Sequence, residues 1–391
     1  MEPPPRDHPR IAALDLARAL AVVLMVVGHT LDAVLSPAAR TDPPVALYWS
    51  ARGVTAPLFL IVSGWALAAA TQGRAVRGFG VLRGRLPRVL LLLALGYALR
   101  WPGWGIALLG QGDPSAWAHL LAFDALHAIA ASLLATSLLL GLPAGVGWKA
   151  GALAALALLA VALGASPPFP ATALPRSIPA LAVAQAVGGT SPFPLFPWSG
   201  YFFAGAAIGL LGAQGDRRFA LALGLGGALL VAAGGWNGVE GMPGGDPRLF
   251  AFRTGASLVL LASLWMVPSA MARLARPIAR ASLAAYAIHL PLVYGWSTHQ
   301  GLQQRIGPQL PLGAALEVAL AVVLATLVAS PAVTGGVALL RRAVERARAP
   351  GARSSLRASQ DLSSALGAGT LARASAQPST KSPGRAPPAR R

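Results

Sequence analysis

The 391-residue sequence contains no cysteine, and only 12% of its residues are charged. The lack of cysteine excludes disulfides, thiolate metal sites and cysteine nucleophiles. No Walker phosphate loop, dinucleotide-binding glycine motif or HExxH zinc motif occurs, which argues against an ATP-driven pump or a zinc protease. Acidic residues are also scarce, because 13 Asp and Glu stand against 32 Lys and Arg, for a formal charge of +19.

Apolar residues are correspondingly abundant: they make up 55% of the chain, which has a mean hydropathy of +0.59. A soluble globule of this size needs more polar surface. Apolar runs of about 20 residues, the length that crosses a bilayer, recur along the chain. We therefore predict an all-α polytopic membrane helix bundle with about ten transmembrane helices, at residues 12–35, 45–71, 86–106, 117–140, 147–164, 197–213, 218–234, 248–268, 278–298 and 313–340.

The positive charge falls in alternate connections between these spans and in the C-terminal tail. Short basic loops stay in the cytoplasm, so we place both termini there and the protein in the inner (plasma) membrane. Because this charge sets the orientation, we expect no nucleic-acid partner. Residues 1–10 form a cytoplasmic N-terminus, 11–345 the transmembrane domain, and 346–391 a disordered basic tail that contacts water or lipid. Residues 166–197, rich in proline, should form an irregular outward-facing loop.

The first span carries four ionisable residues. Each such residue inside a membrane costs roughly 2.5 kcal/mol or more unless it faces a polar interior. Arg18 and His29 are eleven positions apart and therefore share a helical face. Asp32, one turn beyond His29, can orient its imidazole, and Asp15 can pair with Arg18. The structural alternatives are a simple interfacial ion pair of Asp15 with Arg18 and a hydrogen-bonded histidine at the helix end.

Polar residues of several spans should meet in the outer half of the membrane. At about 1.5 Å per residue, five of them lie about 9 to 15 Å below the outer ends of their spans: His29, Arg52, Asp124, His127 and His289. Ser282, Tyr286 and His289 also form an i, i+4, i+7 stripe that can face one cavity. Helix-packing hydrogen bonds are the alternative role for Ser282 and Tyr286, and Trp198 and Tyr201 are either cavity residues or interface aromatics.

At the cytoplasmic end, Arg18 should lie near the arginines of the loop that contains Arg83 and Arg85. A polyanion that approaches from the cytoplasm would find phosphate partners in this region. The alternative for the loop arginines is that they only set the membrane topology.

These residues resemble the motifs of a known family. The segment Asp15-Leu-Ala-Arg18, followed after ten residues by His29, is similar to the first-helix signature of the acyltransferase 3 superfamily. Three further segments resemble its heparan-alpha-glucosaminide N-acetyltransferase-like branch: His29-Thr-Leu-Asp32, Arg52 to Gly64, and Pro197 to Gly205. The segment Ser282-Leu-Ala-Ala-Tyr286-Ala-Ile-His289 is similar to a late-helix motif that both groups share.

The resemblance implies a membrane-bound acyltransferase that moves an acyl group, usually acetyl, from cytoplasmic acetyl-CoA to a sugar amine or hydroxyl on the outer face. It implies no metal. His29 would be the acid/base or a transient acyl carrier, with Asp32 orienting it. Acyl-CoA would be held by Arg18, Asp15, Arg83 and Arg85. The acceptor pocket would be lined by Arg52, Asp124, His127, Trp198, Tyr201, Ser282, Tyr286 and His289.

The expected partners are membrane lipids, acyl-CoA and a glycan or small polar acceptor, and a homodimer is left open. A secondary transporter of a polar or anionic solute would also need buried His, Asp and Arg, and is the main alternative. Transporters often consist of two related halves, and the sequence contains no such repeat. A structural protein of the cell envelope is a third reading, but it would leave the shared depth of the polar residues unexplained.

Overall fold

The computed structural model describes residues 11–72, 78–103, 106–165, 177–212, 216–235, 239 and 241–347. These residues form helices, and only two isolated β-bridges occur among them. The helices are α1 (Ala12–Val34), α2 (Pro37–Arg40), α3 (Pro43–Arg52), α4 (Thr55–Thr71), α5 (Phe79–Leu99), α6 (Ile106–Gly110), α7 (Pro114–Leu121), α8 (Ala125–Gly141), α9 (Val146–Gly164), α10 (Ile178–Val187), α11 (Leu195–Leu211), α12 (Arg217–Gly234), α13 (Pro247–Trp265), α14 (Ser269–Arg280), α15 (Ser282–Tyr294), α16 (Leu302–Arg305) and α17 (Leu312–Ala347).

The chain divides into two units, residues 1–331 and 332–391. Within the described residues, the second unit contains only the C-terminal part of α17. The predicted N-terminus (1–10) and nearly all of the predicted disordered tail (346–391) lie outside the described residues.

The all-α membrane fold predicted from composition is confirmed. Five helices are long and apolar enough to cross a membrane: α1, α9, α12, α13 and the Leu312–Gly336 part of α17. The pair α7 and α8, bent by 55°, adds a sixth when it is counted as one span. The number ten remains a prediction, because α4, α10, α11 and α15 are apolar but shorter.

Several boundaries differ from those predicted. The span at 45–71 is two helices, α3 and α4, and the span at 117–140 is broken between α7 and α8. Helix α10 lies in the segment predicted to be an irregular loop, so that prediction is wrong for residues 178–187. Leu181 and Ala184 of α10 are buried, and the helix packs on α7 and α11, which stabilises it despite the surrounding prolines.

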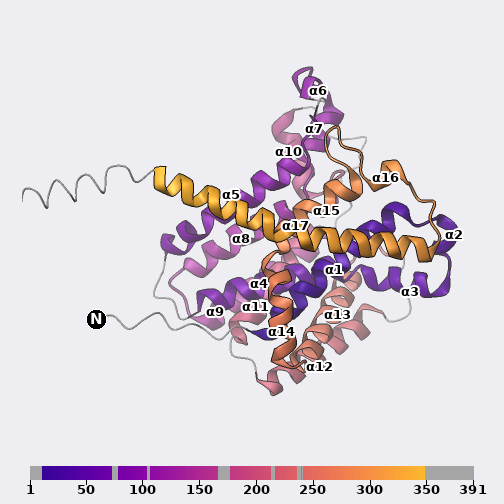
Figure 1. Cartoon of the computed structure of the whole chain (residues 1–391). Coiled ribbons are helices and arrows are strands. Elements are labelled where there is room, and N and C mark those ends of the chain that lie inside the picture. Colours follow the sequence, from indigo (N-terminus) through magenta and orange to yellow (C-terminus); the bar gives the residue numbers. More distant parts are fainter. Residues whose placement is uncertain are drawn as a thin grey trace, which may run out of the picture. The chain divides into compact units, whose positions relative to one another are not determined.

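Helix α1 packs against α4, α13, α14 and α15 (Figure 1). One hydrophobic cluster surrounds α4 and α11, with Ile61, Trp65 and Phe202 almost fully buried. A second cluster joins α1 to α3, α15 and α17, through residues such as Val26, Val34, Val293, Ala315 and Ala319. The second cluster fixes the distance between α1 and α15, which carry the polar residues described below.

Helices α4 and α11 approach closely because glycines face each other at their contact. A Cβ atom at Gly64 would overlap the Phe202 carbonyl oxygen, and one at Gly205 would overlap the Ile61 carbonyl oxygen. Small residues that allow such approaches are typical of helix pairs in membranes. These two glycines belong to the motifs quoted above, and the structure explains them by packing.

Candidate functional site

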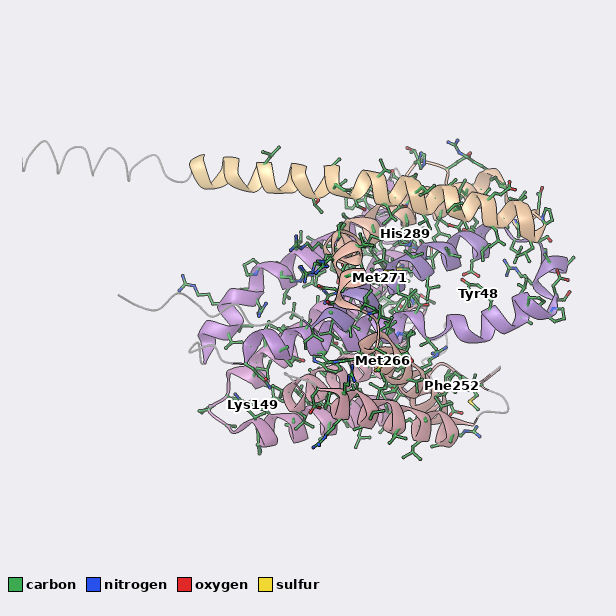
Figure 2. All side chains as sticks on the ribbon, turned by 60° about the horizontal axis from the view of Figure 1, so that its bottom comes forward. Tyr48, Lys149, Phe252, Met266, Met271 and His289 are labelled. Carbon is green, nitrogen blue, oxygen red and sulfur yellow. The ribbon has the colours of Figure 1, made fainter. Side chains whose placement is uncertain are left out.

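Two histidines from distant parts of the sequence contact each other inside the protein. Nδ1 of His29 in α1 lies 3.1 Å from Nε2 of His289 in α15, and the ring centroids are 5.1 Å apart. The His289 side chain has no solvent exposure and lies among packed helices (Figure 2). The ring of Tyr294, at the end of α15, lies 5.5 Å from that of His29. The imidazole of His29 is therefore held by side chains of α15.

A second polar contact forms at the break between α7 and α8. Asp124 begins α8, and its carboxylate accepts hydrogen bonds from the Ala125 N–H and from the Tyr286 hydroxyl of α15. Nε of Arg100, which follows α5, lies 3.9 Å from the same carboxylate. Asp124 is thus held by partners from three parts of the chain.

The two contacts are continuous with each other. Tyr286 and His289 are neighbours on α15, and their rings meet edge to face with centroids 5.7 Å apart. We call the resulting series of five side chains the polar chain: His29, His289, Tyr286, Asp124 and Arg100. The depth estimate from sequence placed three of these residues at one level, and the structure brings those three into one network.

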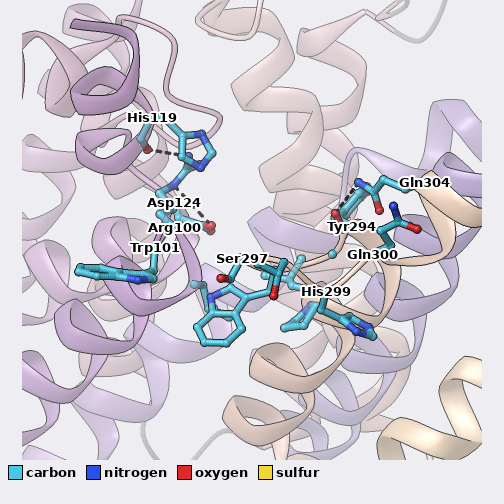
Figure 3. A pocket seen from close by; sticks show the side chains of 15 residues that line it. Arg100, Trp101, His119, Asp124, Tyr294, Ser297, His299, Gln300 and Gln304 are labelled. Atoms are coloured by element: carbon cyan, nitrogen blue, oxygen red, sulfur yellow. Dashed lines mark hydrogen bonds and ion pairs between the residues drawn. The ribbon is translucent and has the colours of Figure 1, made fainter. Parts of the chain in front are cut away.

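A pocket of about 420 Å³ lies at the Asp124 end of the polar chain (Figure 3). Arg100, His119 and Asp124 stand on one side of it, and Tyr294 with Gln304 on the other. The remaining polar and aromatic lining residues include Trp101, Trp296, Ser297, Thr298, His299 and Gln300. Neither His29 nor His289 lines the pocket, but Tyr294 does, and its ring lies 5.5 Å from the His29 ring.

The backbone at the α7–α8 break finds hydrogen-bond partners within the protein. The Phe123 N–H donates to the Ser191 hydroxyl at 2.7 Å, and the Phe193 N–H donates to the Phe123 carbonyl at 3.2 Å. The Asp124 N–H donates to Nδ1 of His127 at 3.1 Å. Unpaired backbone groups are costly at membrane depth, so these partners allow the chain to leave the helix here.

The structure gives His127 a different position from the predicted one. Together with Asp124 it forms a reciprocal capping box at the start of α8, and its ring is fully buried against Tyr97 and Phe123. It does not line the pocket. The i, i+3 spacing that suggested a shared cavity is also the spacing of a capping box, which satisfies two backbone donors at a helix start.

Five other residues predicted for the acceptor pocket do not line this pocket, so their acceptor role stays a prediction: Trp198, Tyr201, Ser282, Tyr286 and His289. Trp198 packs on Phe193, with the Arg253 guanidinium 6.0 Å from its ring, and Tyr201 stacks on Phe250. Ser282 is buried at the first position of α15.

For two other predicted residues, Arg52 and Asp32, we describe the backbone. The Arg52 side chain lies outside the described residues, although its backbone ends α3. Asp32 accepts a hydrogen bond at its backbone carbonyl from Arg40 Nη2, at 2.7 Å. The orienting role of its carboxylate stays a prediction.

The other end of α1 carries a separate charged cluster. Asp15 pairs with Arg276 of α14, whose Nε lies 3.7 Å from the carboxylate. Arg18 lies near enough to Asp15 and Arg88 to interact with both electrostatically. Arg83 is exposed and Arg85 is half-buried in α5. Arg18, Arg88 and Arg276 together outnumber the single carboxylate, which leaves this cluster cationic.

Two acidic helix caps outside the spans, Asp113 and Asp246, have a lowered pKa. Hydrogen bonds from the side chain and backbone of Ser115 hold the pKa of Asp113, the N-cap of α7, below its usual value. A lowered pKa means that this capping interaction is present above the usual Asp pKa and is lost as pH falls through the folded value. Helix α7 carries His119 to the pocket, so the cap helps to position one pocket wall.

Of the residues that line the pocket, the sequence reasoning named only Asp124, and Arg100 and Tyr294 are among those it missed. Arg100 lies within a predicted span, and a charge inside an apolar run was the signal that could have found it. Tyr294 gives no such signal, because aromatic residues are common near the ends of membrane helices. Among the described residues, no group of three or more His, Asp or Glu is arranged to hold a metal ion.

Apolar helices, a buried polar chain and a pocket beside it define a multi-pass membrane protein with an internal site. A family model, described as an acyltransferase domain, matches residues 11–334. The chain therefore belongs to the acyltransferase 3 family and is a membrane acyltransferase. Comparison with curated proteins and with solved structures found no significant match.

Proposed function

We propose that this protein transfers an acetyl group from cytoplasmic acetyl-CoA to an amine or hydroxyl of a glycan or small polar acceptor on the outer face. The observation that carries the proposal is the His29–His289 pair, because His29 lies on the same helix as Arg18 and its ring is 5.5 Å from that of Tyr294, which lines the pocket. Arg18 and His29 are eleven residues apart, which is about 16 Å along α1. Acetyl-CoA has charged phosphates at one end and a long flexible chain that carries the acetyl group, so it would extend from Arg18 to His29.

The cationic cluster of Arg18, Arg88 and Arg276 suits the phosphates of CoA. Arginine guanidinium groups bind phosphate through paired hydrogen bonds. Asp15 already has Arg276 as its ion-pair partner, so Arg18 is the better placed of the two for an incoming phosphate. The exposed Arg83 and the half-buried Arg85 would contribute a weaker, solvent-screened attraction.

The pocket supplies the features of a polar acceptor site. It combines a carboxylate, a guanidinium and two glutamine amides with the aromatic rings of Trp101 and Trp296. Sugars present hydroxyls to such polar groups and C–H faces to aromatic rings. An amino sugar, the acceptor class implied by the heparan-alpha-glucosaminide-like resemblance, could place its amine near Asp124.

In the proposed step, His29 takes the proton from the acceptor amine or hydroxyl as that atom bonds to the acyl carbon. The carbon–sulfur bond then breaks, and the departing CoA thiolate receives the proton from His29. The products are the acylated acceptor and free CoA. An acyl-histidine intermediate would divide the same overall reaction into two transfers.

The direct test is to incubate the purified protein with radiolabelled acetyl-CoA and candidate amino sugars or envelope glycans. We expect CoA release and label on the acceptor, both abolished in His29→Ala and retained in Leu292→Ala, a matched change at a partly exposed position of α15. A label trapped on the protein before acceptor is added would favour the acyl-histidine route. Saturable solute uptake into vesicles without CoA chemistry would favour the transporter and overturn the proposal.

The proposed sidedness has its own test. Single cysteines introduced at Ala39 and Gly244 of this cysteine-free chain should react with impermeant thiol reagents from outside, and one at Gly78 should not. The reverse pattern would contradict the orientation without bearing on the chemistry.

A further inference from the structure

The hydrogen bonds of His289 determine which of its ring nitrogens carries a proton. Nδ1 of His289 lies 2.9 Å from the carbonyl oxygen of Ala285, one turn earlier in α15. A carbonyl oxygen only accepts hydrogen bonds, so Nδ1 must be the donor and must carry a hydrogen. A neutral imidazole has one N–H, and therefore Nε2 of His289 carries the lone pair.

This assignment passes to His29 across their contact. Nε2 of His289, as an acceptor, lies 3.1 Å from Nδ1 of His29. Two lone pairs at this distance would repel, so His29 Nδ1 must carry the hydrogen. In neutral His29 the lone pair then belongs to Nε2.

A second proton on His289 is the competing arrangement, with Nε2 donating to His29. It would put a positive charge on a side chain with no solvent exposure. Burying such a charge is costly unless it is paired. The neighbouring carboxylate, Asp124, is already engaged by Tyr286, Ala125 and Arg100. The neutral arrangement is therefore the one that the packing favours.

We propose that His289 is a positioning residue that fixes the tautomer of His29, with Nδ1 protonated and Nε2 ready to accept a proton or an acyl group. This role differs from lining the acceptor pocket, and it rests on the proposed function of His29. In the transfer step, Nε2 takes the acceptor's proton while the Nδ1–H remains directed at the His289 lone pair. The ring therefore keeps its orientation as it becomes charged and returns the proton to the CoA thiolate.

The proposal is tested by ¹⁵N NMR of the protein labelled at its histidine imidazoles, in detergent micelles or nanodiscs, because protonated and unprotonated ring nitrogens have well-separated shifts. The His29 signals are assigned by their loss in His29→Gln. We expect a protonated Nδ1 and an unprotonated Nε2 on His29 in the wild type. His289→Gln, whose amide oxygen can accept from Nδ1, should keep that tautomer, and His289→Leu should lose it, because an imidazole in water prefers a proton on Nε2.

Kinetics supply the second readout. His289→Leu should lower kcat by at least about tenfold with little change in KM for acyl-CoA, since a wrongly protonated base loses part of its contribution to catalysis. His289→Gln should recover much of this loss, and Leu292→Ala, on the same helix, should behave as the wild type.

The outcomes separate the two proposals. A proton on Nε2 of His29 in the wild type, or an unchanged His29 tautomer in His289→Leu, would overturn the positioning role. The expected tautomers without any acyl transfer would leave the positioning role standing and remove the proposed function.

Discussion

Two helix contacts in this protein differ in what they bury. The α4–α11 contact is apolar and close, because Gly64 and Gly205 let the backbones meet. The α1–α15 contact encloses the His29–His289 pair inside a hydrophobic cluster that includes Val26 and Val293. A membrane protein can form the first kind by packing alone, but the second places polar groups where they need partners. The difference teaches that the motif residues of one family include both glycines that serve the packing and histidines that form a buried polar contact.

The largest effect is expected where the polar contact is broken at His29. His29→Ala should lower turnover by about 10²-fold or more, because it removes the group that accepts the proton. Acyl-CoA binding should remain, since Arg18 is untouched. Steady-state CoA release and donor binding measure the two quantities separately. Near-normal turnover would show that His29 is not the base.

The next largest effect, on acyl-CoA binding, is expected at Arg18, at the opposite end of α1. Arg18→Ala should weaken acyl-CoA binding by about 1.5–3 kcal/mol, the value of a charge-assisted hydrogen bond, and Arg18→Lys should rescue it only in part. Because Asp15 pairs with Arg276, this change leaves that carboxylate with its ion-pair partner. The matched control is Arg217→Ala, an exposed arginine at the start of α12. Equal binding by Arg18→Ala and the wild type would remove Arg18 from the donor site.

The apolar contact should respond in stability instead of turnover. Gly205→Ala forces a methyl group against the α4 backbone and should lower the free energy of unfolding by about 1–3 kcal/mol. Gly151→Ala in α9, where a Cβ meets nothing within 4 Å, is the matched control. Thermal unfolding in detergent compares them, and kcat per folded molecule should stay near the wild-type value. Similar stabilities of the two variants would contradict the close approach of α4 and α11.

The smallest effect is expected at the far side of the polar chain. Tyr286→Phe removes one hydrogen bond to Asp124 and should cost about 1 kcal/mol of stability. Asp124→Asn should cost more, because Asp124 also caps α8 and lies beside Arg100. A double-mutant cycle on unfolding measures whether the pair is coupled. Strict additivity would mean that the Tyr286–Asp124 hydrogen bond does not contribute.

The sequence was informative about the fold wherever period and charge agreed. Apolar runs indicated an all-α membrane protein, and five of them are helices long enough to cross a membrane. Tyr286 and His289, two residues of the predicted stripe, contact Asp124 and His29. The sequence could not distinguish local structures that share one spacing, since the separation of Asp124 and His127 fits either a shared cavity or a capping box. It could not predict ion-pair partners either. The pairing of Asp15 with Arg276 depends on how α14 packs on α1, which no local pattern encodes.

The break between α7 and α8, bent by 55°, leaves backbone groups without the partners that a continuous helix would supply. Its backbone groups are satisfied by Ser191, Phe193 and His127, so lipid can surround this part of the chain without exposing an unpaired N–H or C=O of Phe123 or the Asp124 N–H. The segment between α10 and α11 therefore takes the place of the missing helical turn, because Ser191 and Phe193 supply the hydrogen bonds that a continuous helix would give to Phe123.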